Sequence, residues 1–226
     1  MIPNESAATE ARLLSLGWRE VIVLVGFALA TTLLAWLAQP YWDDGWFELF
    51  RSTGQPFRQV LGDRPVTSSI LSWMEANGQL WPANYLLHFL GWLAVGWATS
   101  IVWSLFFPAL PRLRLVAGCL SIAPVICHYQ MCVIFGGVYL TQVAVVFFGF
   151  WVLASAPRST IAWWKWLLAG LMLFLASLQN EYTVPASIAV GILLLFLSRS
   201  RGLLGKSQFI AAGFLPAIAL AGYVVF

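Results

Sequence analysis

The sequence is poor in charged residues and in cysteine. Charged side chains make up 9% of the 226 residues, against about 25% in an average soluble domain. Hydrophobic residues make up 61%, which is more apolar surface than one soluble core of this size can bury. The same apolar content excludes a disordered chain, and three cysteines are too few for a disulfide-stabilised secreted domain. The remaining class is a multi-pass helical membrane protein.

Several motifs of known chemistry are also absent. The sequence contains no P-loop, no G-x-G-x-x-G and no H-E-x-x-H pattern. It has no arginine-rich membrane helix, and no charged residue lies in the middle of a predicted span, which speaks against ion-coupled transport. The net charge of +3 reflects membrane topology. Because no soluble region is expected, we expect no nucleic-acid partner.

Long stretches without charge predict the spanning helices, since a helix needs about 20 apolar residues to cross a bilayer. The predicted fold class is all-α, a polytopic transmembrane bundle that forms a single domain over residues 1–226. Pro124 makes the third span a candidate for a broken helix. The last span reaches Phe226 without a polar anchor, so we expect the natural chain to continue beyond it. The seven predicted spans lie near residues 20–39, 84–107, 115–129, 134–155, 161–180, 183–198 and 208–226.

The charge distribution predicts the orientation, because basic residues stay on the cytoplasmic side. With these spans and the N-terminus inside, 9 of 12 basic residues lie inside and 6 of 9 acidic residues lie outside. Residues 1–19 then form a cytoplasmic tail and residues 40–83 an extracytoplasmic loop in a plasma-membrane protein. The apolar stretch 21–38 is long for a signal peptide and lacks a good cleavage site, which favours a retained signal anchor.

The loop 40–83 carries 8 of the 21 formal charges. Asp43 and Asp44 follow the first span directly and are flanked by Trp42 and Trp46. Adjacent like charges resist joint ionisation, so one carboxylate is a candidate general base. Alternatively, the pair holds a divalent cation, Mg²⁺ or Mn²⁺, or is a solvated start of the loop.

Two parts of this loop show the spacing of helices that lie on a membrane surface. In the first, Glu48 and Arg51 lie off an apolar face. The second begins at Pro65, and serines separate its apolar residues. The apolar positions are Phe47, Leu49 and Phe50 in the first part, and Val66, Ile70, Trp73 and Met74 in the second.

Four further polar residues are candidates for binding or for ordinary structural roles. Arg64 suits a phosphate contact or a local pair with Asp63. Glu181 lies at an outside helix junction, where it is a functional candidate or an interfacial turn residue. His128 lies between Cys127 and Cys132, in a spacing that matches no metal motif. His88 is expected to be a satisfied histidine, either interfacial or interior.

The layout resembles the GT-C superfamily of polytopic glycosyltransferases, which includes protein mannosyltransferases and oligosaccharyltransferases. The resemblance rests on an N-in first helix, a long first loop and three stretches of sequence. It covers most of the chain as layout, although members of the family are about twice as long, which agrees with a fragment. The matching stretches are Asp43-Asp44-Gly45-Trp46-Phe47, Gly62-Asp63-Arg64-Pro65 and the segment 175–183.

This resemblance implies a reaction at the outer face of a bacterial inner membrane. The donor would be a sugar on a polyprenyl phosphate, and the acceptor a hydroxyl of an envelope glycan or glycolipid. Asp43 or Asp44 would take the acceptor proton, with Asp44 slightly favoured. Arg64, or a metal held by the acids, would stabilise the departing lipid phosphate. The residues expected to bind substrate are Glu48, Arg64, His128, Glu181 and Tyr182.

Two other classes fit the composition. A lipid or solute transporter would need polar groups lining a cavity within the spans, and few such groups are present. A non-catalytic subunit of an envelope assembly would use the first loop only for docking. The polar candidates within the spans are Thr31, Thr32, Gln142 and Ser177.

Overall fold

The computed structural model describes residues 15–37, 49, 51–54, 65–122, 134–154, 162–178, 183–201 and 206–224. Within these ranges the chain forms eight α-helices of ten or more residues and no β-strand, which confirms the all-α class. The helices are α2 (Trp18–Leu37), α5 (Pro65–Ala76), α6 (Leu80–Phe106), α7 (Leu113–Ile122), α8 (Ile134–Ala154), α9 (Trp163–Ser177), α10 (Thr183–Arg201) and α11 (Lys206–Val224).

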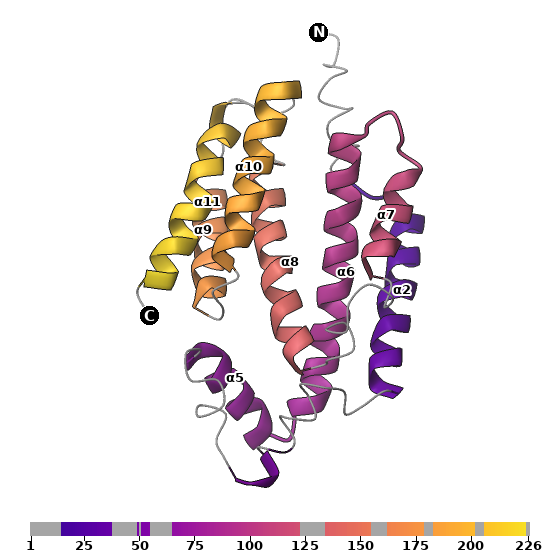
Figure 1. Cartoon of the computed structure of the whole chain (residues 1–226), viewed down its shortest axis with the longest axis vertical. Helices are drawn as coiled ribbons and strands as arrows, with labels where there is room; N and C mark the ends of the chain where they lie inside the picture. The colour runs from indigo at the N-terminus through magenta and orange to yellow at the C-terminus, as the bar shows by residue number, and fades with distance from the viewer. Residues whose placement is uncertain are drawn as a thin grey trace.

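Seven of these helices form a bundle in which consecutive helices run in opposite directions (Figure 1). Each overlaps one of the seven predicted spans, although α7 covers only the first part of the third. The long helix α6 packs against α2, α7 and α8, while α11 packs against α9 and α10. The eighth helix, α5, lies across one end of the bundle, beside the first residues of α6 (Figure 1). We call this the α5 end.

Two of the described helices, α2 and α6, are long and apolar enough to cross a membrane. Shorter apolar segments lie at Leu113–Ile122, Trp163–Ser177, Thr183–Leu193 and Ala212–Val224. This finding agrees with a membrane-associated protein.

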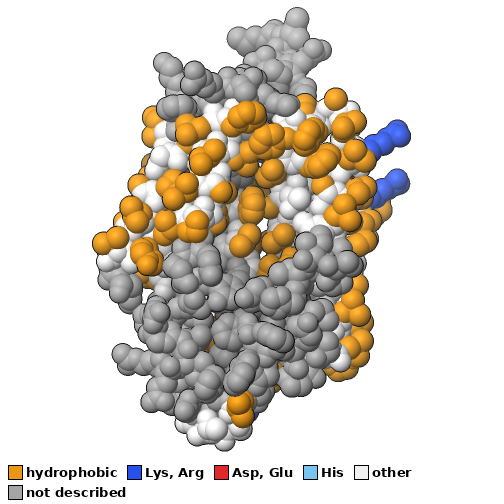
Figure 2. Space-filling view, in the orientation of Figure 1, with side chains coloured by type: hydrophobic (Ala, Val, Ile, Leu, Met, Phe, Trp, Pro, Cys, Tyr) orange, Lys and Arg blue, Asp and Glu red, His pale blue; other side chains and the backbone are white. Residues whose placement is uncertain are grey.

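Large apolar side chains lie on the outside of the bundle. Small and polar residues of α2 face the other helices, while Ile22, Leu29 and Leu37 are more than half exposed. Figure 2 shows hydrophobic side chains over most of the described part of one face. A soluble helix has the opposite pattern, with its apolar stripe inside. Apolar patches of this extent need a covering partner or a lipid environment.

Glycines allow the helices to approach closely. A Cβ on Gly118 of α7 would lie 2.7 Å from the carbonyl oxygen of Gly96 on α6 and would also strike the Ser100 hydroxyl. A Cβ on Gly191 of α10 would meet the carbonyl of Ala212 on α11. Small residues at such contacts are typical of helix packing in membranes, because they allow backbones to come together.

Several predicted helix boundaries differ from the structure by a few residues. The second span was expected from residue 84, but α6 begins at Leu80. Pro82 lies in the first turn of α6, where proline is tolerated because its missing N–H has no intrahelical partner. The third span was expected to reach residue 129; α7 is described as far as Ile122, and residues 123–129 lie outside the described part of the chain.

Candidate functional site

The residues predicted to carry chemistry lie outside the described part of the chain. This applies to the predicted catalytic and metal-binding pair Asp43 and Asp44. It also applies to the predicted substrate-binding residues Glu48, Arg64, His128, Glu181 and Tyr182. In the described residues no group of three or more His, Cys, Asp or Glu side chains could hold a metal ion. The geometry that bears on the site is therefore that of the elements on either side of these positions.

The helices next to these residues point to the α5 end. Helix α2 ends there, at Leu37, before the sequence reaches Asp43. Arg64 directly precedes the first residue of α5. Helix α10 starts with its first residue directed towards the same end, directly after Tyr182 (Figure 1). The described elements that flank the three predicted stretches of sequence thus begin or end at the same end of the bundle.

Helix α5 confirms the prediction of a helix in the first loop. Its buried side chains are Thr67, Ser68, Leu71 and Met74. The sequence predicted that Ile70, Trp73 and Met74 lie on the apolar face of a helix on the membrane surface. Ile70 and Trp73 are 37% and 64% exposed on the bundle, while Leu71 and Met74 turn towards Leu80 of α6 and form a small core with it.

A tight turn connects α5 to α6. The N–H of Gln79 donates to the carbonyl of Met74 at 2.7 Å, and that of Gly78 to the carbonyl of Glu75 at 2.9 Å. Gly78 has a φ of 66°. This pair of bonds with a left-handed glycine is the Schellman motif, which satisfies the last carbonyls of a helix. It fixes α5 against the first turn of α6.

Charged and polar side chains also make contacts at the junction between α5 and α6. Arg51 Nε lies 2.8 Å from Glu75 Oε1, so the first loop is tied to α5. Asn84 is fully buried, and its Nδ2 donates to the carbonyl of Leu80 at 2.7 Å and contacts Met74 Sδ at 3.8 Å. Its Oδ1 has no hydrogen-bond partner among the described residues. Nothing in the sequence pattern singled out Asn84, which lies at the predicted start of a span.

A buried hydrogen-bond network joins α2 to α6. His88 is fully buried; its Nδ1 lies 3.0 Å from Thr32 Oγ1, and its Nε2 accepts from Trp92 Nε1 at 3.2 Å. The indole N–H can only donate, so Nε2 is unprotonated and Nδ1 carries the proton. His88 is therefore neutral; both of its ring nitrogens have partners, as expected, and of the two expected settings it occupies the interior. Next to it, Thr31 Oγ1 donates to the carbonyl of Ile122 at 3.1 Å.

An ion pair holds the opposite end of α2. Arg114 Nε donates to Glu20 Oε1 at 2.6 Å, and its Nη2 contacts the other carboxylate oxygen. The N–H of Gly17 also donates to this carboxylate at 2.7 Å. Such a two-point contact is the strong form of an arginine–carboxylate pair. In the sequence, Glu20 and Arg114 served only as topology markers.

Comparison with known proteins gives no relative: no family model, no curated protein and no solved structure matches this chain.

Proposed function

We propose that this chain is a membrane glycosyltransferase that moves a sugar from a polyprenyl-phosphate donor to a hydroxyl of an envelope glycan or glycolipid. It would lie in a bacterial inner membrane, with its site on the outer face. The observation that carries the proposal is the layout of the α5 end. There an apolar first helix finishes just before Asp43, and the loop that follows forms a helix packed against the next long apolar helix.

The packing of the flanking helices supports this layout in two ways. The Thr32–His88–Trp92 network fixes the half of α2 that leads to Asp43 and Asp44. The turn at Gly78 and the pair Arg51–Glu75 fix α5, which begins directly after Arg64. Catalytic groups carried on rigid elements keep their geometry better than groups on free loops. Both predicted stretches are therefore attached to well-packed helices.

In the proposed reaction, one carboxylate of the Asp43–Asp44 pair accepts the proton of the acceptor hydroxyl. The hydroxyl oxygen bonds to the anomeric carbon of the donor as the bond from that carbon to the phosphate oxygen breaks. The lipid phosphate leaves with the electron pair of that bond and gains negative charge. The Arg64 guanidinium stabilises this charge through two parallel hydrogen bonds.

Donor consumption tests this proposal. The complete reading frame is expressed in membranes and supplied with a panel of labelled polyprenyl-phosphate sugars, with Asp44→Asn and Asp43→Asn variants beside it. We expect label to leave one donor in the wild type and to stay on it in at least one variant. A chelator added to a parallel sample shows whether a divalent cation is needed.

The same assay includes the outcomes that would contradict the proposal. If well-folded full-length protein consumes no donor, glycosyl transfer is wrong, and movement of a labelled lipid across vesicles then tests the transporter alternative. If neither aspartate variant loses activity, the catalytic assignment is wrong even when donor is consumed.

A further inference from the structure

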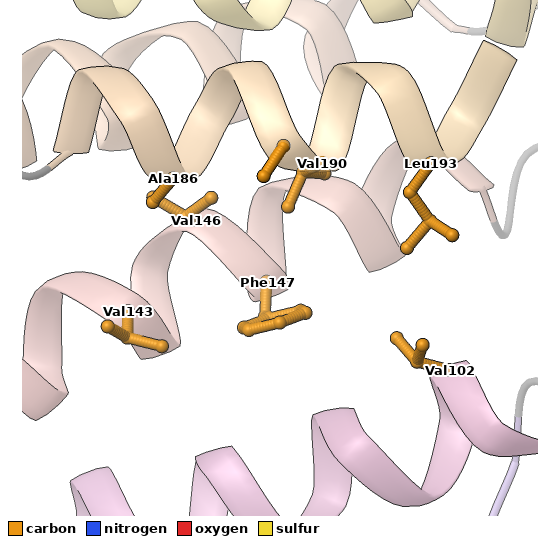
Figure 3. Close-up of a pocket in the computed structure, with 8 residues that line it drawn as sticks. Val102, Val143, Val146, Phe147, Ala186, Val190 and Leu193 are labelled. Atoms are coloured by element: carbon orange, nitrogen blue, oxygen red, sulfur yellow. The ribbon is translucent and has the colours of Figure 1, made fainter.

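An apolar groove lies between α6, α8 and α10 (Figure 3). Its volume is about 310 Å³, and its eight lining side chains are all Val, Leu, Ala or Phe. Helix α6 contributes Val102, α8 contributes three residues and α10 contributes four. None of these residues belongs to the predicted catalytic site.

The groove has a buried floor and an open rim. Val146 of α8 and Val190 of α10 form the floor and are only 1% and 5% exposed. Phe147 and Leu193 are half-buried, and Ala189 is exposed. The groove therefore opens on the surface of the bundle and is not a sealed internal void.

The groove is elongated along the helices. Its α10 residues are Ala186, Ala189, Val190 and Leu193, a spacing that places them in one stripe on one face. At 1.5 Å per residue the stripe is about 10 Å long, which is about a third of the hydrocarbon thickness of a bilayer. In a chain that spans the membrane, its long direction follows the lipid chains.

The lining limits what can occupy this space. Water and polar ligands need polar partners, and the described residues that line the groove offer none. An apolar cavity of about 150 Å³ takes up benzene, so a volume of about 310 Å³ has room for a hydrocarbon segment of roughly twice that size. Left empty, the lining side chains would lose dispersion contacts.

We propose that this groove is a fixed binding site for one acyl chain of a bilayer phospholipid. The bound chain fills the space between α10 and α6 and contacts α8 along the floor. The inference rests on the membrane placement within the proposed function and is independent of sugar transfer. A polyprenyl chain has related chemistry, but phospholipid acyl chains surround any spanning helix and already lie parallel to the groove.

The test compares two neighbouring substitutions on α10. Ala189→Phe places a large side chain in the groove. Ile188→Phe adds an aromatic ring next to it, at a residue that is 44% exposed and does not line the groove. Both variants and the wild type are reconstituted in vesicles of phosphatidylethanolamine and phosphatidylglycerol with a small share of a long-chain polyprenyl phosphate. They are then extracted in mild detergent, and retained lipid is identified by native mass spectrometry.

We expect the wild type and Ile188→Phe to retain one phospholipid, and Ala189→Phe to retain about tenfold less. Circular dichroism and size exclusion confirm that each variant folds, and Leu193→Phe replaces Ala189→Phe if Ala189→Phe does not fold.

Equal retention of phospholipid in all three proteins overturns the proposal, and so does retention of polyprenyl phosphate in place of phospholipid. A dimer of the wild type that Ala189→Phe abolishes would overturn it too, because a partner's side chain would then be the occupant. Each readout is independent of transferase activity, so a failure here and a failure of the proposed function are distinguishable.

Discussion

At the scale of single residues, substitution of His88 is expected to cause a large loss of stability. Replacing it with Ala opens a cavity in a fully buried position and leaves the Trp92 indole N–H without its acceptor. We expect His88→Ala to destabilise the protein by about 2–4 kcal/mol, measured by unfolding in detergent micelles. Thr32→Val removes one partner and keeps the imidazole, so its expected cost is about 0.6–1.7 kcal/mol. Wild-type stability of His88→Ala would contradict the network.

The ion pair at the opposite end of α2 gives a second prediction at this scale. Arg114→Gln leaves the half-buried Glu20 carboxylate without its two-point partner, so we expect a loss of about 1.5–3 kcal/mol. Arg112 is an exposed arginine two positions away in the sequence, and Arg112→Gln is the matched control with no expected effect. Glu20→Gln combined with Arg114→Gln completes a double-mutant cycle. Additive losses in that cycle would show that the pair is not coupled.

Prediction from sequence was uneven at this scale. It identified His88 as a histidine with satisfied hydrogen bonds, but left open whether it lies at the interface or in the interior. It could not name Thr32 or Trp92 as those partners, and it missed the pair Glu20–Arg114. The two members of that pair are 94 positions apart, and only the packing of α7 beside α2 brings them together. The predicted catalytic residues lie outside the described part of the chain and stay predictions.

At the scale of elements, the turn between α5 and α6 depends on one glycine. Gly78 has a φ of 66°, and a Cβ added to it would meet no atom within 4 Å, so Gly78→Ala introduces backbone strain and no collision. We expect a loss of about 1–2 kcal/mol, seen in the unfolding transition. Gly26 in α2 has equally open surroundings but ordinary helical geometry, so Gly26→Ala should be neutral or stabilising. A similar effect of both substitutions would mean that the turn is not required.

A glycine at a contact between two helices responds differently from Gly78, because an added methyl group collides with the neighbouring helix. Gly118→Ala places its methyl group against the Ser100 hydroxyl and the Gly96 carbonyl. These groups belong to the backbone and a hydrogen-bonded side chain of α6, so α7 has to move. We expect a loss of about 1–3 kcal/mol, the usual range for overpacking, and separation of α7 from α6. Cross-linking of cysteines placed on the two helices checks this, and unchanged cross-linking would contradict it.

Element-level prediction from sequence worked best where charge interrupts long apolar runs. Every predicted span has its helix, because uncharged stretches of this length and composition favour helices that bury their own backbone hydrogen bonds. The sequence was less informative about which face of a helix packs against its neighbour. On α5 the predicted apolar positions included Ile70, Trp73 and Met74, but the pattern did not show which residues contact α6; these are Leu71 and Met74. The turn at Gly78 rotates α5 relative to α6, and periodicity alone carries no such information.

At the scale of the whole molecule, the charge distribution predicts a cytoplasmic N-terminus, and labelling in intact cells tests it. In a cysteine-free background, Ser72→Cys reports the α5 end and Arg112→Cys the opposite end; both positions are exposed. The bundle separates them because α6 runs between the two ends over 27 residues, about 40 Å at 1.5 Å per residue, which exceeds the hydrocarbon core. We expect a membrane-impermeant maleimide to label Ser72→Cys in intact cells and Arg112→Cys only after the membrane is opened.

The reverse pattern would place Asp43 and Asp44 on the cytoplasmic side, where a donor presented from the outer leaflet does not reach them. Labelling of both positions in intact cells would contradict the spanning arrangement itself.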